Sequence, residues 1–277
     1  MSIAYILSRK RGKNICAFTL KSNEDELDVA KSRDVAKRFK LALTEVKVAP
    51  NGKYLSLSSH NYDPSRKLIS EKNLGEFIQD EIVQSSLYTS ASPKKDNAFC
   101  AFAMQLIGRA LQDSGFSAVF CGEGPNEMLN DYGFVPSEYG YPSNELGDIG
   151  FREALTFGQK KTDRQLGRGG LAKHATARMG KIFAAYGIRL EAPYFNQDIS
   201  RIMTKIPHKE SYDKIKQCLM HEVFKKDGFN DLIVGVSKEK FQDGSGVSKL
   251  FKDYTQQRLL EIFKDIYGVM KTGYLGQ

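Results

Sequence analysis

The chain is organised around residues 117–127, which read Ser117-Ala118-Val119-Phe120-Cys121-Gly122-Glu123-Gly124-Pro125-Asn126-Glu127. The apolar run at 118–121 is typical of a strand buried on both faces of a parallel sheet. It leads directly into Gly122, Glu123 and Gly124, and open α/β sheets bind ligands at the carboxyl ends of their strands. Glycines beside a carboxylate let backbone approach a ligand closely. An ordinary turn with a solvated glutamate is the alternative interpretation, because short glycine motifs arise by chance.

Helices and strands alternate on the amino-terminal side of this stretch. Strands predicted at 15–20 and 41–48 flank a helix that begins at Asp25 or Asp28 and ends near Phe39. A further helix ends at Gly115, and its inward face is predicted to carry Phe99, Phe102, Ala103, Leu106 and Ala110. This rhythm predicts an α/β fold built on a parallel sheet.

The pattern changes near residue 148. Residues 55–92 are polar apart from one amphipathic helix at 73–87, and beyond Asp148 the sequence predicts helices and no convincing strand. The helices predicted there span 151–161, 171–186, 198–205, 212–226 and 247–267. We therefore expect an α/β lobe at 1–147 and a mainly helical lobe at 148–277.

Composition narrows the classes of protein that fit. No stretch approaches the roughly 20 apolar residues of a membrane span, and the first residues lack a signal-peptide core and cleavage site. The 4 cysteines are scattered without a C-x-x-C pair, which favours free thiols in the cytoplasm. The net charge of +8 is spread over many helices rather than gathered with stacking aromatics, so we expect no nucleic-acid partner and no membrane.

Two further motifs lie downstream. Residues 189–196 read Arg-Leu-Glu-Ala-Pro-Tyr-Phe-Asn, and residues 238–246 read Lys-Glu-Lys-Phe-Gln-Asp-Gly-Ser-Gly. Together with residues 117–127 they resemble the synthetase domain of asparagine synthetase and of relatives such as the β-lactam synthetases. That family carries S-G-E-G-x-D-E, then R-x-P-F-L-D, then a glycine-rich K-x-x-F segment. The resemblance covers nearly the whole chain, with the motifs in the family's order.

The resemblance implies a fold of the PP-loop ATP pyrophosphatase type, with a nucleotide-binding first lobe and a helical second lobe that completes the site. It implies an AMP-forming amide ligase, which joins a small, aspartate-like carboxylic acid to ammonia or an amine. ATP and Mg²⁺ are the implied cofactors, because both steps place negative charge on phosphate. No resident protein-bound metal site is expected.

The family's functional residues carry over position by position. Lys238 matches the catalytic lysine, with Lys240 as the neighbouring candidate, and Glu123 matches the glutamate that takes a proton from the attacking amine or orders it. The remaining predicted contacts to nucleotide or substrate are Leu20, Cys121, Gly122, Gly124, Asn126, Glu127, Arg178 and Asn196.

Three of these positions depart from the family pattern. Cys121 stands for a serine, and Asn126 and Asn196 each stand for an aspartate. Where such acids hold a substrate amino group, neutral amides alter specificity. The departures therefore put aspartate itself in doubt as the substrate, while ATP chemistry is retained.

The sequence contains no S-G-G-x-D-S loop, the segment that grips pyrophosphate in the family, and no glutaminase domain. Its first residues resemble the helix that follows that loop, so the first strand of the sheet is expected to be missing. The strands at 15–20 and 118–121 would then flank a gap with unpaired backbone groups. A partner polypeptide, a truncated sequence and a rearranged relative are the three accounts.

Two hypotheses follow. The first is a ligase that forms the carboxyl-terminal part of a split or truncated enzyme and is inactive as an isolated chain. The second is a non-catalytic binding or scaffold protein that kept the fold. The retained Glu123 and Lys238 favour the first, while the absent loop, Asn126 and Asn196 favour the second.

Overall fold

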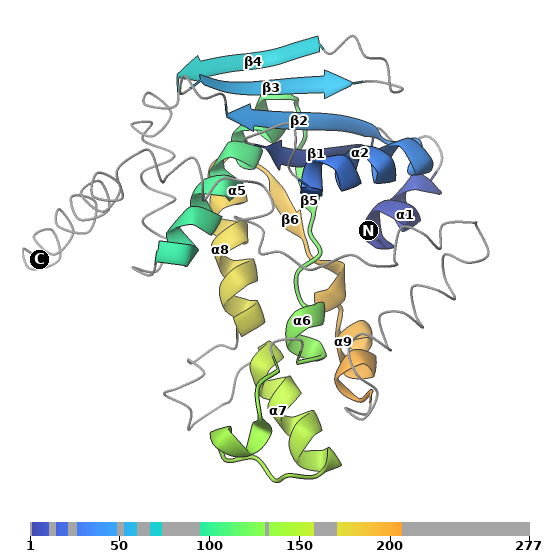
Figure 1. Cartoon of the computed structure of the whole chain (residues 1–277), viewed down its shortest axis with the longest axis vertical. Helices are drawn as coiled ribbons and strands as arrows, with labels where there is room; N and C mark the ends of the chain where they lie inside the picture. Colours follow the sequence, from blue (N-terminus) through green and yellow to red (C-terminus); the bar gives the residue numbers. More distant parts are fainter. Residues whose placement is uncertain are drawn as a thin grey trace, which may run out of the picture.

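The computed structural model describes residues 2–10, 15–21, 27–48, 53–59, 67–73, 95–130, 133–157 and 171–206. These residues form a mixed α/β structure with two sheets (Figure 1). The larger sheet has the strand order β1 (Cys16–Lys21), β2 (Ala42–Val48), β3 (Lys53–Ser59) and β4 (Lys67–Asn73). The smaller sheet consists of β5 (Ala118–Phe120) and β6 (Arg189–Glu191).

The prediction of a parallel sheet is confirmed only in part. β1 and β2 pair in parallel around α2 (Leu27–Phe39), but β3 and β4 continue the sheet in antiparallel fashion. Residues 55–92 were expected to be polar apart from one helix, and no strand was named there, although β3 and β4 lie largely within this stretch. The reason is that β3 and β4 mix leucines with many serines and lysines, which is a polar pattern that an antiparallel strand tolerates because one face can meet water. The helix predicted at 73–87 falls outside the described residues, except that Asn73 ends β4.

The prediction of no strand beyond Asp148 was also wrong, because β6 pairs in parallel with β5. A strand of 3 residues that reads Arg-Leu-Glu has no apolar run for a sequence pattern to detect. β5 differs from expectation too, since Phe120 is 47% exposed and the strand is not buried on both faces. The pairing crosses the expected boundary at 147, and the division into two lobes stays a prediction.

One apolar core lies under both sheets. α5 (Lys95–Asp113) and α8 (Leu171–Ala185) pack against each other, and their inward residues share a cluster with Leu20 of β1 and Val46 of β2. Val119 of β5 and Leu190 of β6 pack against the same cluster. The two helices approach closely at Gly108, where an added methyl group would lie 2.6 Å from the Tyr186 ring.

β1 and β5 lie over this shared core without belonging to one sheet. The rings of Phe18 in β1 and Phe116, just before β5, meet edge to face with their centroids 5.4 Å apart. Among the described strands, however, β1 pairs with β2 and β5 pairs with β6, and the two sheets are separate. β1 is thus the end strand of the larger sheet, on the side near β5 (Figure 1).

Three helices enter their following strands through the same connection. After α5, the Gly115 and Phe116 amides donate to the carbonyls of Gln112 and Leu111, and Gly115 has φ +75°. This is the Schellman arrangement, in which a left-handed residue closes the helix. The same pair of bonds follows α8 at Gly187 and α2 at Lys40. Helix stops at 39, 113 and 185 are therefore built alike.

A group of helices gathers at the end of the molecule away from the larger sheet (Figure 1). α6 (Pro125–Met128), α7 (Glu145–Phe157) and α9 (Gln197–Thr204) pack against one another. α1 (Ser2–Ser8) lies beside α2 at the other end. Among the described helices, none is long and apolar enough to cross a membrane.

Lys40 is the weak member of the three connections, because its φ of +54° is costly for a residue with a Cβ atom. We expect Lys40→Gly to raise the free energy of unfolding by about 0.5–1 kcal/mol, because glycine adopts this conformation without strain. The greater entropy of glycine in the unfolded chain offsets part of this gain. Chemical denaturation measures the change. The matched control is Lys31→Gly in the interior of α2, which should lower stability by about 1 kcal/mol. A loss at both positions would contradict the assignment of Lys40.

Candidate functional site

The candidate site is the turn that follows β5. The pairing with β6 extends one residue past the strand, because the Cys121 amide donates to the Glu191 carbonyl at 2.9 Å. Gly122 comes next and is exposed, with nothing within 4 Å of the place where a Cβ atom would stand. Glu123 follows and is half-buried. The backbone at Gly122 is therefore open to a ligand at the carboxyl end of the strand.

Gly124 joins this turn to the second motif. It is buried with φ +117°, a conformation that side chains with a Cβ atom rarely adopt. A Cβ atom there would lie 3.2–3.3 Å from Phe195 and Tyr194 and 3.1 Å from Met128. Tyr194 and Phe195 belong to the short helix η2 (Pro193–Phe195), which follows β6. Two of the three predicted motifs thus meet, because parallel strands end at the same edge.

Cys121 lies within the electrostatic reach of Glu123. Burial raises the pKa of the Cys121 thiol, the Glu123 carboxylate raises it further, and a backbone hydrogen bond from Glu123 partly opposes both. The thiol is therefore protonated at neutral pH. A protonated thiol is a poor nucleophile, so Cys121 suits the role of a neutral neighbour to a ligand rather than that of an attacking group.

Asn196 has a structural partner in α9. Its side-chain oxygen accepts hydrogen bonds from the amides of Asp198 at 3.0 Å and Ile199 at 3.5 Å, which is the geometry of a helix N-cap. Aspartate caps helices as well as asparagine does, so the departure from the family's acid leaves the cap intact. The substrate contact stays a prediction. Asn126 is half-buried in α6, directly after the turn.

The other predicted residues are spread more widely. The Leu20 side chain is buried in the core, one residue before the end of β1, and its contact with a nucleotide stays a prediction. Arg178 is half-buried on α8. Lys238 and Lys240 lie outside the described residues, as does the side chain of Glu127. Within the parts of the chain that the structure describes, no three His, Cys, Asp or Glu residues gather as a metal-binding group.

A charged cluster that sequence reasoning missed links the carboxyl end of β1 to the middle of β2. Lys21 is fully buried, and its Nζ is 2.5 Å from the Glu45 carboxylate. Arg33 of α2 reaches the same carboxylate through Nε at 2.6 Å and Nη2 at 3.0 Å. The amino-end half of this sheet face is apolar, with Ala17 and Leu43 packed in a cluster of α1 and α2. The alternation of side chains along the strands could have predicted that Lys21 and Glu45 share one face of the sheet. Their burial could not be predicted in this way, because it depends on how α2 covers that face.

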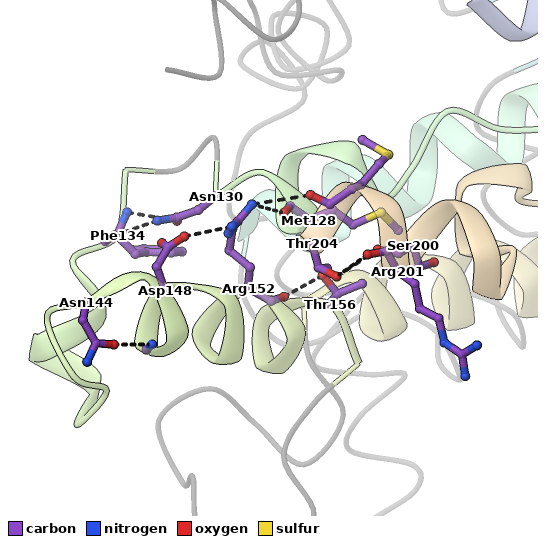
Figure 2. Close-up of polar contacts among 12 residues, drawn as sticks. Met128, Asn130, Phe134, Asn144, Asp148, Arg152, Thr156, Ser200, Arg201 and Thr204 are labelled. Carbon is purple, nitrogen blue, oxygen red and sulfur yellow. Dashed lines mark hydrogen bonds and ion pairs between the residues drawn. The ribbon is translucent and has the colours of Figure 1, made fainter. Parts of the chain in front are cut away.

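A second buried ion pair lies in α7, where Arg152 also reaches α6 and α9 (Figure 2). Arg152 on α7 is 1% exposed, and its Nη2 is 2.9 Å from Asp148 one turn earlier. Its Nη1 donates to the carbonyls of Met128 in α6 at 3.5 Å and Met203 in α9 at 3.4 Å. Burial lowers the pKa of the guanidinium, while Asp148 acts in the opposite direction. The i, i+4 spacing was visible in the sequence, but such pairs usually lie on the surface.

The two glycines of the turn give a matched pair of variants. We expect Gly124→Ala to lower the free energy of unfolding by about 1–3 kcal/mol, because alanine is strained at that φ and its methyl group crowds Phe195. Gly122→Ala should leave stability within about 0.5 kcal/mol, because the space around it is open. Thermal and chemical unfolding measure both. Equal losses in the two variants would contradict this geometry of the turn.

The thiol of Cys121 reports on Glu123. We expect Glu123→Gln to speed alkylation of Cys121 at pH 7.5, because removing the carboxylate lowers the pKa of the thiol and so raises the thiolate fraction. Iodoacetamide labelling followed by peptide mass spectrometry measures the rate. Cys16 is the internal control, since its pKa is raised by burial and its hydrogen-bond partner is Thr44. A Cys121 rate that stays unchanged while unfolding is excluded would contradict the interaction.

Comparisons with known proteins add no family name. No protein-family model matches the chain, and no curated protein matches it.

Proposed function

We propose that this chain carries the synthetase site of an ATP-dependent amide ligase of the asparagine synthetase type. In the first step, a substrate carboxylate oxygen attacks the α-phosphorus of ATP, and the bond to the leaving pyrophosphate breaks. In the second step, ammonia or an amine attacks the acyl carbon, loses a proton to a base, and displaces AMP. Mg²⁺ would enter with the nucleotide and neutralise phosphate charge.

The observation that carries the proposal is the junction of two motif turns. Gly124 is buried against Tyr194 and Phe195, and the strands before both turns are parallel neighbours. Positive φ at Gly124 and open space at Gly122 are what a backbone needs if it is to turn sharply and still admit a ligand. A glycine-rich turn that arose by chance would not be expected to pack against a second motif from the other half of the chain.

Glu123 is the proposed base of the second step. It is half-buried and lies within electrostatic reach of the Cys121 thiol, which is itself partly desolvated by burial. General-base catalysis needs a carboxylate within hydrogen-bond reach of the attacking amine. Lys238, with Lys240 as the alternative, is proposed to stabilise charge on the phosphate and on the tetrahedral intermediate.

The substrates are proposed by class only. A small carboxylic acid fits the resemblance, but Asn126 and Asn196 replace the family's acids, so the acid partner need not be aspartate. Arg178 and Glu127 remain candidate contacts for it. The amine is proposed to be ammonia or another small amine, as the resemblance implies.

A partner segment is proposed between β1 and β5. The two strands rest on the same core and yet belong to separate sheets. A parallel strand inserted there, followed by an S-G-G-x-D-S loop, would join the sheets and supply the amides that grip pyrophosphate. Each added ladder bond contributes about 0.5–1.5 kcal/mol net, so the inserted strand would stabilise the chain as well as complete the site.

The test supplies that segment in trans. A synthetic peptide with a five-residue apolar strand and an S-G-G-x-D-S loop is added to the purified chain with ATP, Mg²⁺ and a panel of small carboxylic acids and amines. We expect pyrophosphate and AMP release with the peptide and none without it, together with a Tm raised by roughly 2–4 °C for each kcal/mol gained. Glu123→Gln should lower the rate at least about tenfold.

The controls separate binding from chemistry. A peptide whose loop glycines are replaced by alanine should keep the Tm gain and lose turnover, because the strand still pairs while the loop cannot wrap phosphate. Glu138→Gln, at an exposed carboxylate of η1 (Pro136–Tyr139), should leave turnover unchanged. Turnover by the chain alone would contradict the split site. A Tm gain with no turnover for any acid or amine would favour the scaffold alternative.

A further inference from the structure

The turn after β5 and the turn after β6 are joined twice. They touch directly, where Gly124 is buried against Tyr194 and Phe195. They are joined again at their far ends, where Arg152 of α7 donates to the last carbonyl of α6 and to a carbonyl in the last turn of α9. Residues 124–128 and residues 194–203 are thus connected at both ends, and we call this pair of segments the frame.

Each side of the frame is short and internally bonded. On one side, the Met128 amide donates to the Gly124 carbonyl at 3.1 Å, so the end of α6 moves with the glycine turn. On the other side, the buried Ser200 hydroxyl donates to the carbonyls of Tyr194 and Asn196, both at 2.9 Å. α9 therefore moves with the second turn. A shift of Arg152 would be passed to both turns.

The guanidinium of Arg152 is also held by contacts within its own helix, α7. The Asp148 carboxylate pairs with Nη2 at 2.9 Å and holds the side chain against α7. The Thr156 hydroxyl donates to the Arg152 backbone carbonyl at 2.7 Å, which is a bond within the same helix (Figure 2). The two bonds to α6 and α9 are long, at 3.5 and 3.4 Å. They are assisted by charge, however, and the Arg152 side chain that donates them is buried.

We infer that Arg152 is a positioning residue, which holds the glycine turn and the Pro193 turn in one arrangement and so sets where Glu123 stands relative to the second motif. Its effect on catalysis rests on the proposed function, while its effect on the two turns does not. An apolar side chain of similar length would fill the space but could not bond two carbonyls at once.

Hydrogen exchange of the full chain tests this without any ligand. We expect Arg152→Met to raise amide exchange at 124–130 and 196–206 together, by about tenfold, while β1 and β2 keep the exchange of the parent chain. Thr156→Val is the matched control, because it removes a buried bond that stays within α7. If Arg152→Met unfolds the chain, Arg152→Lys keeps a charge for Asp148 and should show the same pattern at smaller amplitude.

Turnover with the strand peptide gives the second measurement. Arg152→Lys should lower kcat by about tenfold to a hundredfold and leave the KM for ATP within twofold, because misplaced catalytic groups cost rate. The inference would be overturned if exchange rose only in α7, rose equally through the chain, or rose as much in Thr156→Val. An unchanged kcat for Arg152→Lys in an active complex would also overturn it. Coupled exchange in a protein with no turnover would support the frame and refute the ligase.

Discussion

The parallel pairing of β5 with β6 is the constraint on which the candidate site depends. It joins residues 118–120 to residues 189–191 and places the turns after both strands at one edge. A pair of 3-residue strands is marginal by itself. It persists because Val119 and Leu190 pack on the core formed by α5 and α8. Burial of apolar surface in those helices therefore holds a polar turn in place.

The same core explains how the larger sheet is oriented. Leu20 and Val46 turn toward α5 and α8, while Lys21 and Glu45, their neighbours in sequence, turn toward α2. The alternation of a strand thus divides β1 and β2 into an apolar face and a face that carries Lys21 and Glu45. Ion pairs there are buried and well connected, since Arg33 meets Glu45 through two nitrogens. These charges belong to the larger sheet, whereas the candidate turn follows β5 of the smaller sheet.

The second constraint is the buried Arg152, which links the helices that follow the candidate turn. Buried charge is costly unless it is paired, and Arg152 is paired with Asp148 and directed at backbone carbonyls. A buried arginine makes a specific demand on its neighbours, because its donors lie in a fixed plane. α6, α7 and α9 together meet part of that demand, since Nη1 donates to carbonyls of α6 and α9 and Nη2 lies beside the Asp148 carboxylate of α7. The helical end of the molecule is therefore specified by polar contacts as much as by apolar packing.

Local physics was enough to predict the helices that end in left-handed residues and the strands that follow them. Apolar spacing located α2, α5 and α8, and Gly115 ended α5 where expected, because these signals act within a few residues. The same local pattern around Gly122, Glu123 and Gly124 identified the turn. β3, β4 and β6 were missed, because short or polar strands owe their existence to a partner that sequence spacing cannot reveal. The cap of α9 is local as well, since Asn196 accepts from the amides of Asp198 and Ile199. Only tertiary structure could bury Arg152, because its carbonyl partners in Met128 and Met203 come from distant parts of the chain.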